Sequence, residues 1–554
     1  MKQNNKQGHP KALYTLFATE MWERFSYYGM RALFTLYLTA ELINGGFGLS
    51  DDEALKLYAV FTGLVYLTPI LGGWVADKFL GKRKTVYIGG LVMAVGQFLL
   101  AASAFLSNSL DPQTRLILFN FGLGVLIIGN GFFKPNISTI VGDFYDDNDP
   151  RKDSAFNIFY MGINLGAIMG PFIAGALGEK VAWGWGFLAA GVGMILSVIW
   201  LNARENTLED KGLPPNSPEG KYILDKKDWK DIILYSIGII IGTFVIMTIW
   251  RKLPHTVTDI ITIIGFTAMI LGLSYVIIRG IEEGNTWKKK FYGVVAVVAI
   301  FLIVKYGGIW ANLSGEAQKY ILYIVALLAL ASIIMLLRNE NKDWSRMGVI
   351  ITLAFFNIAF WAGFEQAGGT FNIFAKKFTD RTFFGWEMPA SWFQNINPIA
   401  ILILAPIFSV VWLKLDKMKL NPRTSIKFAL GLFFGALAFF IMTQAQNLID
   451  NGATKVSPMW LFVVYVVLTL GELMLSPIGL SMITKLANPK LVSVVMGLWM
   501  ASFAAGNFMA GMLKSILKQY DFPLYPFIMW VMLGAGLIIV LLSPLLNKAM
   551  KGIH

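Results

Sequence analysis

The stretch from Glu20 to Arg31 places ionisable side chains inside an otherwise apolar segment. It reads E-M-W-E-R-F-S-Y-Y-G-M-R. On a helix, at about 100° per residue, its polar and aromatic positions cover an arc of roughly 140° on one side. These positions are Glu20, Glu23, Arg24, Tyr27, Tyr28 and Arg31. Because a charge left in hydrocarbon costs several kcal/mol, such a stripe inside a membrane helix indicates a functional site that handles charge.

Three further charged residues stand in long apolar runs. Lys134 lies in G-N-G-F-F-K-P-N-I-S, Glu365 in F-W-A-G-F-E-Q-A-G-G, and Glu472 in T-L-G-E-L-M-L-S-P-I-G-L. The lysine needs an acid partner, which Glu20 or Glu23 could provide, or it snorkels toward a helix end. The two lone acids either form structural salt bridges or line a cavity, and the nearby glycines and prolines favour interrupted helices around a cavity.

Other polar and aromatic side chains recur in the same runs. Asn164 follows Tyr160 by one helical turn, and glycines at 162, 166 and 170 form a row that permits close helix packing. The remaining candidates are Tyr66, Trp361, Asn397 in Q-N-I-N-P, Ser476 one turn after Glu472, and Trp499 in G-L-W-M-A-S. For Tyr66 and for the glycines, plain packing is an equally good explanation.

Taken together, these residues predict a polar cavity with opposite poles. The first half of the chain offers the cations, and the second half offers two lone acids. A small zwitterion would fit, with its carboxylate near Arg31 and Lys134 and its ammonium near Glu472. The walls would be aromatic, which suits side chains of varied shape. The expected wall residues are Tyr27, Tyr28, Tyr66, Trp361 and Trp499.

Composition places these residues in a membrane. Of 554 residues, 56% are hydrophobic and only 15% are charged, whereas soluble domains contain about 25% charged residues. The net charge of +13 is explained by basic cytoplasmic loops rather than by binding to nucleic acid. The chain has no cysteine, and His9, His255 and His554 all lie outside the apolar runs. A buried proton carrier must therefore be Asp or Glu, and no metal or nucleophile constellation favours an enzyme.

The apolar runs predict an all-α polytopic membrane protein of fourteen to sixteen spans, arranged as six, four and six. The basic loops between them place both termini in the cytoplasm. D-K-F-L-G-K-R and D-K-M-K-L-N-P-R recur at matching places and suggest two related bundles. We expect bundles at 1–206 and 347–554, with a linker and inserted helices at 207–346. The expected spans are 12–40, 55–77, 85–106, 115–139, 155–178, 184–202, 231–250, 258–279, 291–307, 318–337, 347–375, 392–414, 424–446, 458–485, 491–515 and 525–547.

Several of these segments resemble signatures of one family. E-M-W-E-R-F-S-Y-Y-G, G-N-G-F-F-K-P-N-I-S-T and F-Y-M-G-I-N-L-G-A are similar to three signatures of the proton-dependent oligopeptide transporters, a branch of the major facilitator superfamily. F-W-A-G-F-E-Q and G-E-L-M-L-S-P-I-G-L resemble that family's motifs in the second half. G-G-W-V-A-D-K-F-L-G-K-R resembles the superfamily's loop motif. Bacterial relatives commonly insert two helices between the bundles, whereas this chain is expected to insert four.

The resemblance implies a role for each candidate residue. Glu20, Glu23 and Arg24 would form a proton-coupling cluster salt-bridged to Lys134, and Arg31 would pair with Glu365 across the bundles. The amino end of a peptide would be held by Asn164, Asn397 and Glu472. The carboxyl end and backbone would be held by Arg31, Lys134 and the tyrosines. Ser476 is a further substrate-binding candidate, and Trp361 and Trp499 would line side-chain pockets.

The implied function is proton-coupled import of di- and tripeptides by alternating access. The alternative is proton-coupled transport of another small solute, such as nitrate or a peptide-like conjugate. We expect no cofactor, with protons as the coupling ion. We also expect a monomer in the cytoplasmic (inner) membrane of a bacterium, in contact with substrate, protons and lipid bilayer but not with nucleic acid.

Overall fold

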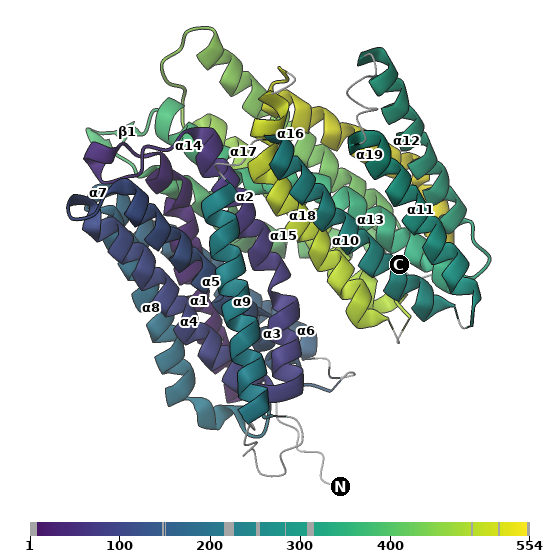
Figure 1. The fold of residues 1–554 in the computed structure, drawn as a ribbon, viewed down its shortest axis with the longest axis horizontal. Helices are drawn as coiled ribbons and strands as arrows, with labels where there is room; N and C mark the ends of the chain where they lie inside the picture. Colours follow the sequence, from purple (N-terminus) through teal and green to yellow (C-terminus); the bar gives the residue numbers. More distant parts are fainter. Residues whose placement is uncertain are drawn as a thin grey trace.

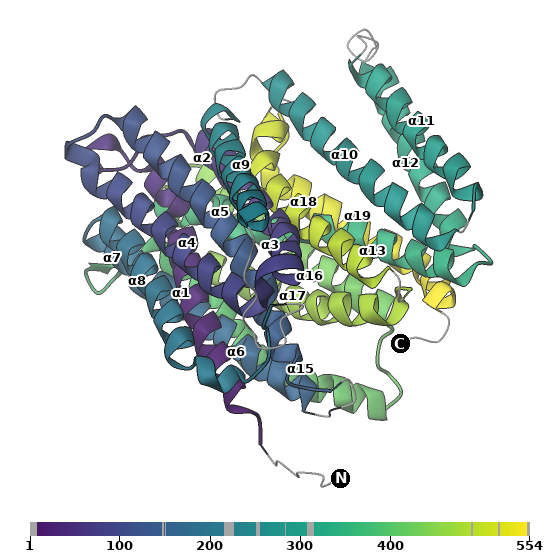
Figure 2. The ribbon, with the colours of Figure 1, turned by 60° about the horizontal axis from the view of Figure 1, so that its bottom comes forward.

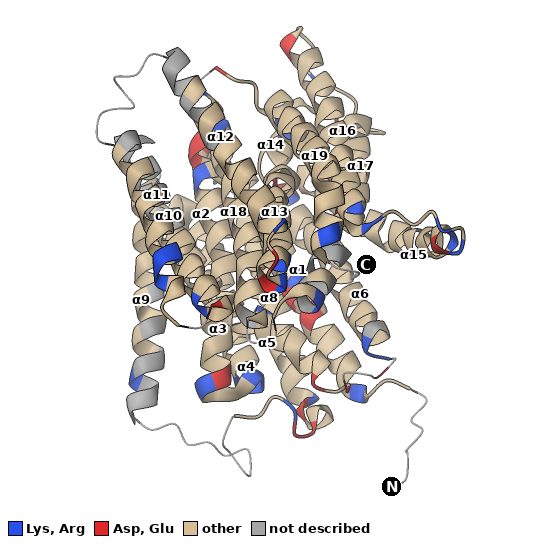
Figure 3. Ribbon diagram, turned by 90° about the vertical axis from the view of Figure 1, so that its right-hand side faces the viewer, with Lys and Arg blue, Asp and Glu red and all other residues tan. Residues whose placement is uncertain are grey.

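Long apolar helices make up almost all of the chain that the structure describes (Figure 1). This computed structural model describes residues 8–146, 149, 151–214, 226–250, 255–282, 284–306, 315–488, 491–518 and 521–550. Each predicted span coincides with a helix or with consecutive helices, so the prediction of an all-helical membrane fold is confirmed. Figure 3 shows that charged residues gather near helix ends and loops and that few of them lie along the middle of the helices.

The first half of the chain contains a compact group of helices. Their bounds are α1 Lys11–Thr39, η1 Leu42–Asn44, α2 Asp51–Leu67, α3 Pro69–Val75, η2 Ala76–Leu80, α4 Gly81–Phe105, η3 Leu106–Asn108, α5 Pro112–Gly142, α6 Lys152–Gly170, η4 Pro171–Gly175, α7 Ala176–Lys180, α8 Trp183–Ala203 and η5 Glu205–Leu208. Within this group α4 packs on α5 and α8, while α1 packs on α6 and α8.

The second half forms a matching group. Its elements are α13 Lys342–Phe364, η6 Glu365–Ala367, α14 Thr370–Phe378, β1 Thr382–Phe383, β2 Trp386–Glu387, η7 Ala390–Asn395, α15 Ile396–Lys417, α16 Thr424–Asp450, α17 Met459–Leu486, α18 Val492–Lys518 and α19 Leu524–Met550. Here α16 packs on α17 and α19, and α13 packs on α18 and α19. The two strands form an antiparallel hairpin that pairs Thr382 with Glu387.

Four inserted helices lie between the two halves in the sequence. In space, one of them packs on the first half and the others lie with the second. The four helices are α9 Lys226–Trp250, α10 His255–Ile281, α11 Thr286–Tyr306 and α12 Gly315–Leu337. The first of them packs on α5 and α2, whereas α10 contacts α18 and α12 contacts α13 and α19. Figures 1 and 2 show α9 against the first half and α10, α11 and α12 beside the second half.

One of the two expected helix breaks is present. The span after residue 342 changes from α13 to the short η6 at Glu365, as expected for an interrupted helix. The expected break near Glu472 is wrong, because α17 runs without interruption from Met459 to Leu486. Membrane helices tolerate a proline when neighbouring groups satisfy the freed carbonyl.

The molecule has two ends that differ in charge and in contacts. One end, here called the latch face, contains the end of α1, the start of α2, α7, α14 and η7. The other end, the basic face, contains the loops at 77–84, 338–346 and 414–419, which are rich in Lys and Arg. The two halves meet along α2 and α18, α6 and α15, and α1 and α14.

The row of glycines on α6 allows close packing against α1, as the sequence predicted. A Cβ on Gly170 would lie 2.7 Å from the backbone nitrogen of Gly29 and the carbonyl oxygen of Phe25. Because both atoms belong to backbone, neither could move aside without shifting α1. The absence of side chains along this row therefore lets α6 hold α1, and its charged stripe, at close range.

We expect Gly170→Ala to destabilise the protein. The added methyl group should push α6 from α1 and cost about 1–3 kcal/mol, since overpacking a tight contact has this effect. Thermal unfolding in detergent, followed by intrinsic fluorescence, should show a lower midpoint. Gly534→Ala is the matched control, because nothing lies within 4 Å of a Cβ there. A midpoint for Gly170→Ala at or above that of the control would contradict this account.

Candidate functional site

Three charged residues on α1 form a buried cluster. Nε of Arg24 lies 3.0 Å from Oε1 of Glu20, and the same guanidinium also pairs with Glu23. From α5, Nδ2 of Asn130 lies 3.3 Å from Oε1 of Glu23 and donates to it. All three charged side chains are almost completely buried. One guanidinium thus neutralises part of the charge of two carboxylates at a depth where an isolated carboxylate would be costly.

This cluster keeps unused hydrogen-bonding capacity. Among the described residues, Oε2 of Glu20 and Nη2 of Arg24 have no hydrogen-bond partner. Two carboxylates that share one cation leave one negative charge in excess within the cluster. A proton is the smallest ion that could remove that excess, so the arrangement is chemically suited to proton uptake.

Lys134 does not join the cluster. Its Nζ lies 4.2 Å from the centroid of the Tyr66 ring, above the ring face. No ion pair to this lysine is present among the residues that the structure describes, so the predicted salt bridge to the α1 cluster is wrong for this structure. Arg24 already occupies both acids, and a cation–π contact replaces the carboxylate. In the described part of the chain, the lysine therefore contacts an aromatic ring and forms no ion pair.

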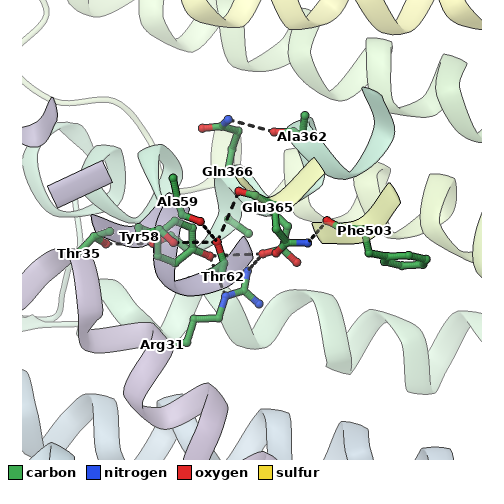
Figure 4. A network of polar contacts seen from close by, with 12 residues as sticks. Arg31, Thr35, Tyr58, Ala59, Thr62, Ala362, Glu365, Gln366 and Phe503 are labelled. Carbon is green, nitrogen blue, oxygen red and sulfur yellow. Dashed lines mark hydrogen bonds and ion pairs between the residues drawn. The ribbon is translucent and has the colours of Figure 1, made fainter. Parts of the chain in front are cut away.

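The second arginine of the stripe reaches the other half of the molecule. Nη2 of Arg31 lies 2.6 Å from Oε2 of Glu365, so the pair expected from the sequence is present. Nε of Arg31 also donates to the hydroxyl of Tyr58 at 2.9 Å, and that hydroxyl lies 3.4 Å from Glu365. Figure 4 shows these three side chains converging from α1, α2 and η6.

Backbone contacts reinforce this junction on the latch face. The hydroxyl of Thr35 donates to the carbonyl of Gly368 at 3.0 Å, and Nδ2 of Asn372 donates to the carbonyl of Ala32 at 2.9 Å. A Cβ at Gly368 would clash with the hydroxyl of Tyr58 and lie 2.8 Å from Nε of Arg31, so a side chain there would displace the two groups that contact Glu365. The halves are therefore closed against each other at this end.

Beneath the junction lies a partly enclosed cavity of about 140 Å³. Its lining combines aromatic rings with a few polar groups, which is typical of a small-molecule site. The residues predicted from sequence that line it are Tyr28, Arg31, Tyr66, Asn164, Trp361, Glu365, Asn397 and Glu472. The polar lining residues absent from the predicted site are Tyr160, Gln394 and Tyr465.

The acidic pole of the cavity is built by two helices of the second half. Nδ2 of Asn397 on α15 lies 2.8 Å from Oε2 of Glu472 on α17, and 2.9 Å from the hydroxyl of Thr469. Across the cavity, Asn164 on α6 donates to the carbonyl of Tyr160. The side-chain oxygen of Asn164 and the carboxylate of Glu472 are both acceptors, which suits a ligand that carries an ammonium group.

Three residues predicted to bind substrate do not line the cavity. Tyr27 packs against Phe61, with ring centroids 6.4 Å apart, because one helical position rotates it about 100° from Tyr28. Lys134 contributes only through the ring of Tyr66, which does line the cavity. The third, Trp499, is fully buried, and the ring of Phe503 lies between it and Trp361.

The side chain of Ser476 lies outside the described residues. The residues that sequence reasoning missed gave no distinguishing signal, because a single Tyr or Gln in an apolar run is compatible with plain packing. Tyr58 is an example: it is fully buried, and the contacts of its hydroxyl with Arg31 and Glu365 show that it belongs to the site.

Comparisons with known proteins agree with this geometry. The chain matches the model described as "POT family" over residues 83–221 and 252–528. It is 33% identical to the "Peptide transporter YePEPT" of Yersinia enterocolitica over 94% of this chain and 90% of the relative. It is 31% identical to a "Di-/tripeptide transporter" of Lactococcus lactis subsp. cremoris over 92% and 90%. An "Uncharacterized transporter YclF" of Bacillus subtilis is 33% identical over 99% and 96%.

Solved structures show the same fold. A crystal structure of the peptide transporter POT in complex with sulfate has a TM-score of 0.71 and 30% identity, covering 100% of this chain and 98% of the other. A mutant of peptide transporter POT in complex with alafosfalin has a TM-score of 0.71 at 31% identity, covering 99% and 98%. The predicted fold of two helix bundles with inserted helices is therefore confirmed.

We expect the contributions of Arg31 and Glu365 to the free energy of unfolding to be coupled, because each neutralises the other. Glu365→Met leaves a buried guanidinium without its anion and should cost about 3–5 kcal/mol of stability. The double variant Arg31→Met with Glu365→Met should recover most of that loss, because neither charge remains. Thermal unfolding of the two single variants and the double variant in detergent measures the coupling. Strictly additive losses would contradict a direct pair.

Proposed function

Because the chain belongs to the POT family, we propose that it is a proton-coupled symporter that imports di- and tripeptides by alternating access. The observation that carries the proposal is the cavity with opposite poles beneath a closed ion pair. Glu472 and Asn397 form the acidic pole, while Arg31 and, behind Tyr66, Lys134 form the basic pole. A peptide is a zwitterion whose charged ends need such a pair of poles.

The proposed binding mode depends on which charged side chains of the site already have an ion-pair partner. Arg31 is engaged by Glu365 and Tyr58, so it is not available to a carboxylate while the junction is closed. Lys134 has no ion pair among the described residues, and it would receive the peptide carboxylate once the Tyr66 ring, which lines the cavity and contacts its Nζ, moves aside. The peptide ammonium takes its place between Glu472 and the oxygen of Asn164, and the rings of Tyr28, Tyr66 and Trp361 form the side-chain walls.

Proton coupling is assigned to the carboxylates that hold cations. Protonation of Glu365 would cancel the attraction that holds Arg31, and the two halves would lose a contact on the latch face. Protonation of Glu20 or Glu23 would remove the excess negative charge beside Arg24. Loss of the proton on the other side would restore each pair. The same carboxylates thereby link proton movement to the order in which the two ends open.

We place the basic face in the cytoplasm, because loops rich in Lys and Arg stay on that side. The latch face then faces outward, and the cavity belongs to a state closed to the outside. Both termini lie in the cytoplasm, and the protein resides in the cytoplasmic (inner) membrane of a bacterium. We propose that it acts as a monomer, since each chain contains a complete pair of poles.

Uptake into proteoliposomes tests the function. With an inward proton gradient, radiolabelled Ala-Ala should accumulate several-fold above the level without a gradient. Glu23→Gln should lose this accumulation yet retain peptide counterflow, because an amide keeps the cavity but cannot take up the proton. Nitrate is the comparison substrate. Gradient-driven accumulation of nitrate but of no di- or tripeptide would overturn the proposal.

The role of Lys134 is tested by removing the peptide carboxylate. Lys134→Gln should weaken the inhibition of counterflow by Ala-Ala on the order of tenfold, as expected for loss of one charged hydrogen bond. Inhibition by Ala-Ala amide should stay at the wild-type level, since it has no carboxylate to lose. Lys82→Gln, at an exposed ion pair with Asp143 on the basic face, is the control. Equal weakening for both peptides would show that the lysine does not read the carboxylate.

A further inference from the structure

Glu179 connects the two halves at a point separate from the Arg31–Glu365 pair. It belongs to α7 of the first half, and its side chain is 1% exposed. Its two oxygens accept backbone N–H groups of the second half, Oε2 from Ala390 at 3.0 Å and Oε1 from Ser391 at 2.8 Å. Nζ of Lys376, also from the second half, lies 3.6 Å from Oε2.

The two N–H groups begin a helical run that leads into the cavity. They open η7, which passes directly into α15 at Ile396. This run carries Gln394 and Asn397, both of which line the cavity, and Asn397 holds Glu472. The first N–H groups of a helical run have no partner within it, and a carboxylate there is favoured by the helix dipole. Here the cap comes from the opposite half of the molecule.

Close packing surrounds this cap. A Cβ at Gly175 would lie 3.0 Å from Cβ of Ser391, so the first half meets η7 at a position without a side chain. Nearby, the rings of Phe172 and Trp392 are 4.7 Å apart, and Nζ of Lys180 lies 3.5 Å from Glu387 in the hairpin. In Figure 1, α7 and the hairpin strand β1 lie at the same edge of the latch face.

We propose that Glu179 is a positioning residue that makes the amino-end site depend on closure of the latch face. While the halves are closed, its carboxylate fixes the start of η7 and therefore the place of Asn397. When the halves part, the same two N–H groups lose their cap, and the segment that carries Gln394 and Asn397 is no longer held. The bond is made to backbone, so protonation of Glu365 does not release it directly. This inference rests on the proposed function only for its effect on peptide binding.

The experiment uses the natural absence of cysteine. Ala367→Cys places one thiol in the cavity wall just below the junction, where a membrane-impermeant maleimide can reach it in intact cells only when the latch face opens. Adding Glu179→Gln should raise the labelling rate on the order of tenfold, because one charged cap is lost. The KM for Ala-Ala should rise more than kcat falls, and Glu179→Asp should recover part of both effects.

Lys377→Gln is the matched control. It removes another ion pair between the halves on the latch face, to Asp51, but that lysine is 46% exposed and such pairs contribute little. Labelling and KM should stay at the wild-type level in this variant. If Glu179→Gln labels at the control rate with an unchanged KM, the inference is wrong even though peptide uptake stands. The labelling readout needs no peptide, so it also holds if the proposed substrate is wrong.

A cross-link keeps the inference testable if Glu179→Gln folds poorly. Gly175→Cys with Ser391→Cys brings two thiols together at the capped segment, and the Ser391 hydroxyl has no hydrogen-bond partner among the described residues to lose. Oxidation should stop uptake and protect a cavity thiol from outside labelling, and reduction should restore both. Full transport by the oxidised protein would show that this contact does not have to open.

Discussion

A buried charge in a membrane is stabilised by an opposite charge, and the charges of the first helix do not all find one on that helix. Arg24 finds its anions on its own helix, in Glu20 and Glu23. Arg31, two turns further along, has no acid on α1 within reach and pairs with Glu365 of the other half. The same requirement is therefore met locally in one case and across the molecule in the other. Because Arg31 has only this distant solution, it ties the two halves together.

The two kinds of connection between the halves differ in what can break them. The Arg31–Glu365 pair joins two ionisable side chains, so a proton on the carboxylate or a competing anion at the guanidinium weakens it. Glu179 is also a carboxylate, but its partners are backbone N–H groups, which do not titrate and can still donate to it when it is protonated. We propose that the first connection responds mainly to the coupling ion and the substrate, and the second mainly to the distance between the halves. Together, the two contacts would make closure of the latch face depend both on ion and substrate binding and on how closely the halves approach.

The sequence predicted the elements and charges well but not their exact directions. Apolar runs gave every span, and the lone acids marked the cavity, because hydrocarbon permits few exceptions. Tyr27 and Tyr28 are adjacent in sequence, yet only Tyr28 lines the cavity, since the helix rotation that separates them is fixed by packing. The sequence predicts a carboxylate partner for Lys134, but Arg24 pairs with Glu20 and Glu23 instead. Which of the two cations pairs with these acids depends on tertiary distances. Glu179 carried no signal at all, because an acid at a polar helix end is ordinary.

The position of Lys134 suggests the order in which the two cations become available to a bound carboxylate. The Lys134 ammonium lies over the ring of Tyr66 without an ion pair among the described residues, so it can pair with an anion that reaches it. Arg31, by contrast, is already neutralised and gains nothing from a carboxylate until Glu365 gives it up. In the proposed mechanism, the carboxylate of an entering zwitterion is drawn first to the lysine, and protonation of Glu365 makes the arginine available to it. Substrate and proton therefore act on different residues of one site in this mechanism: the peptide carboxylate neutralises the lysine, and the proton on Glu365 releases the arginine from the junction between the halves.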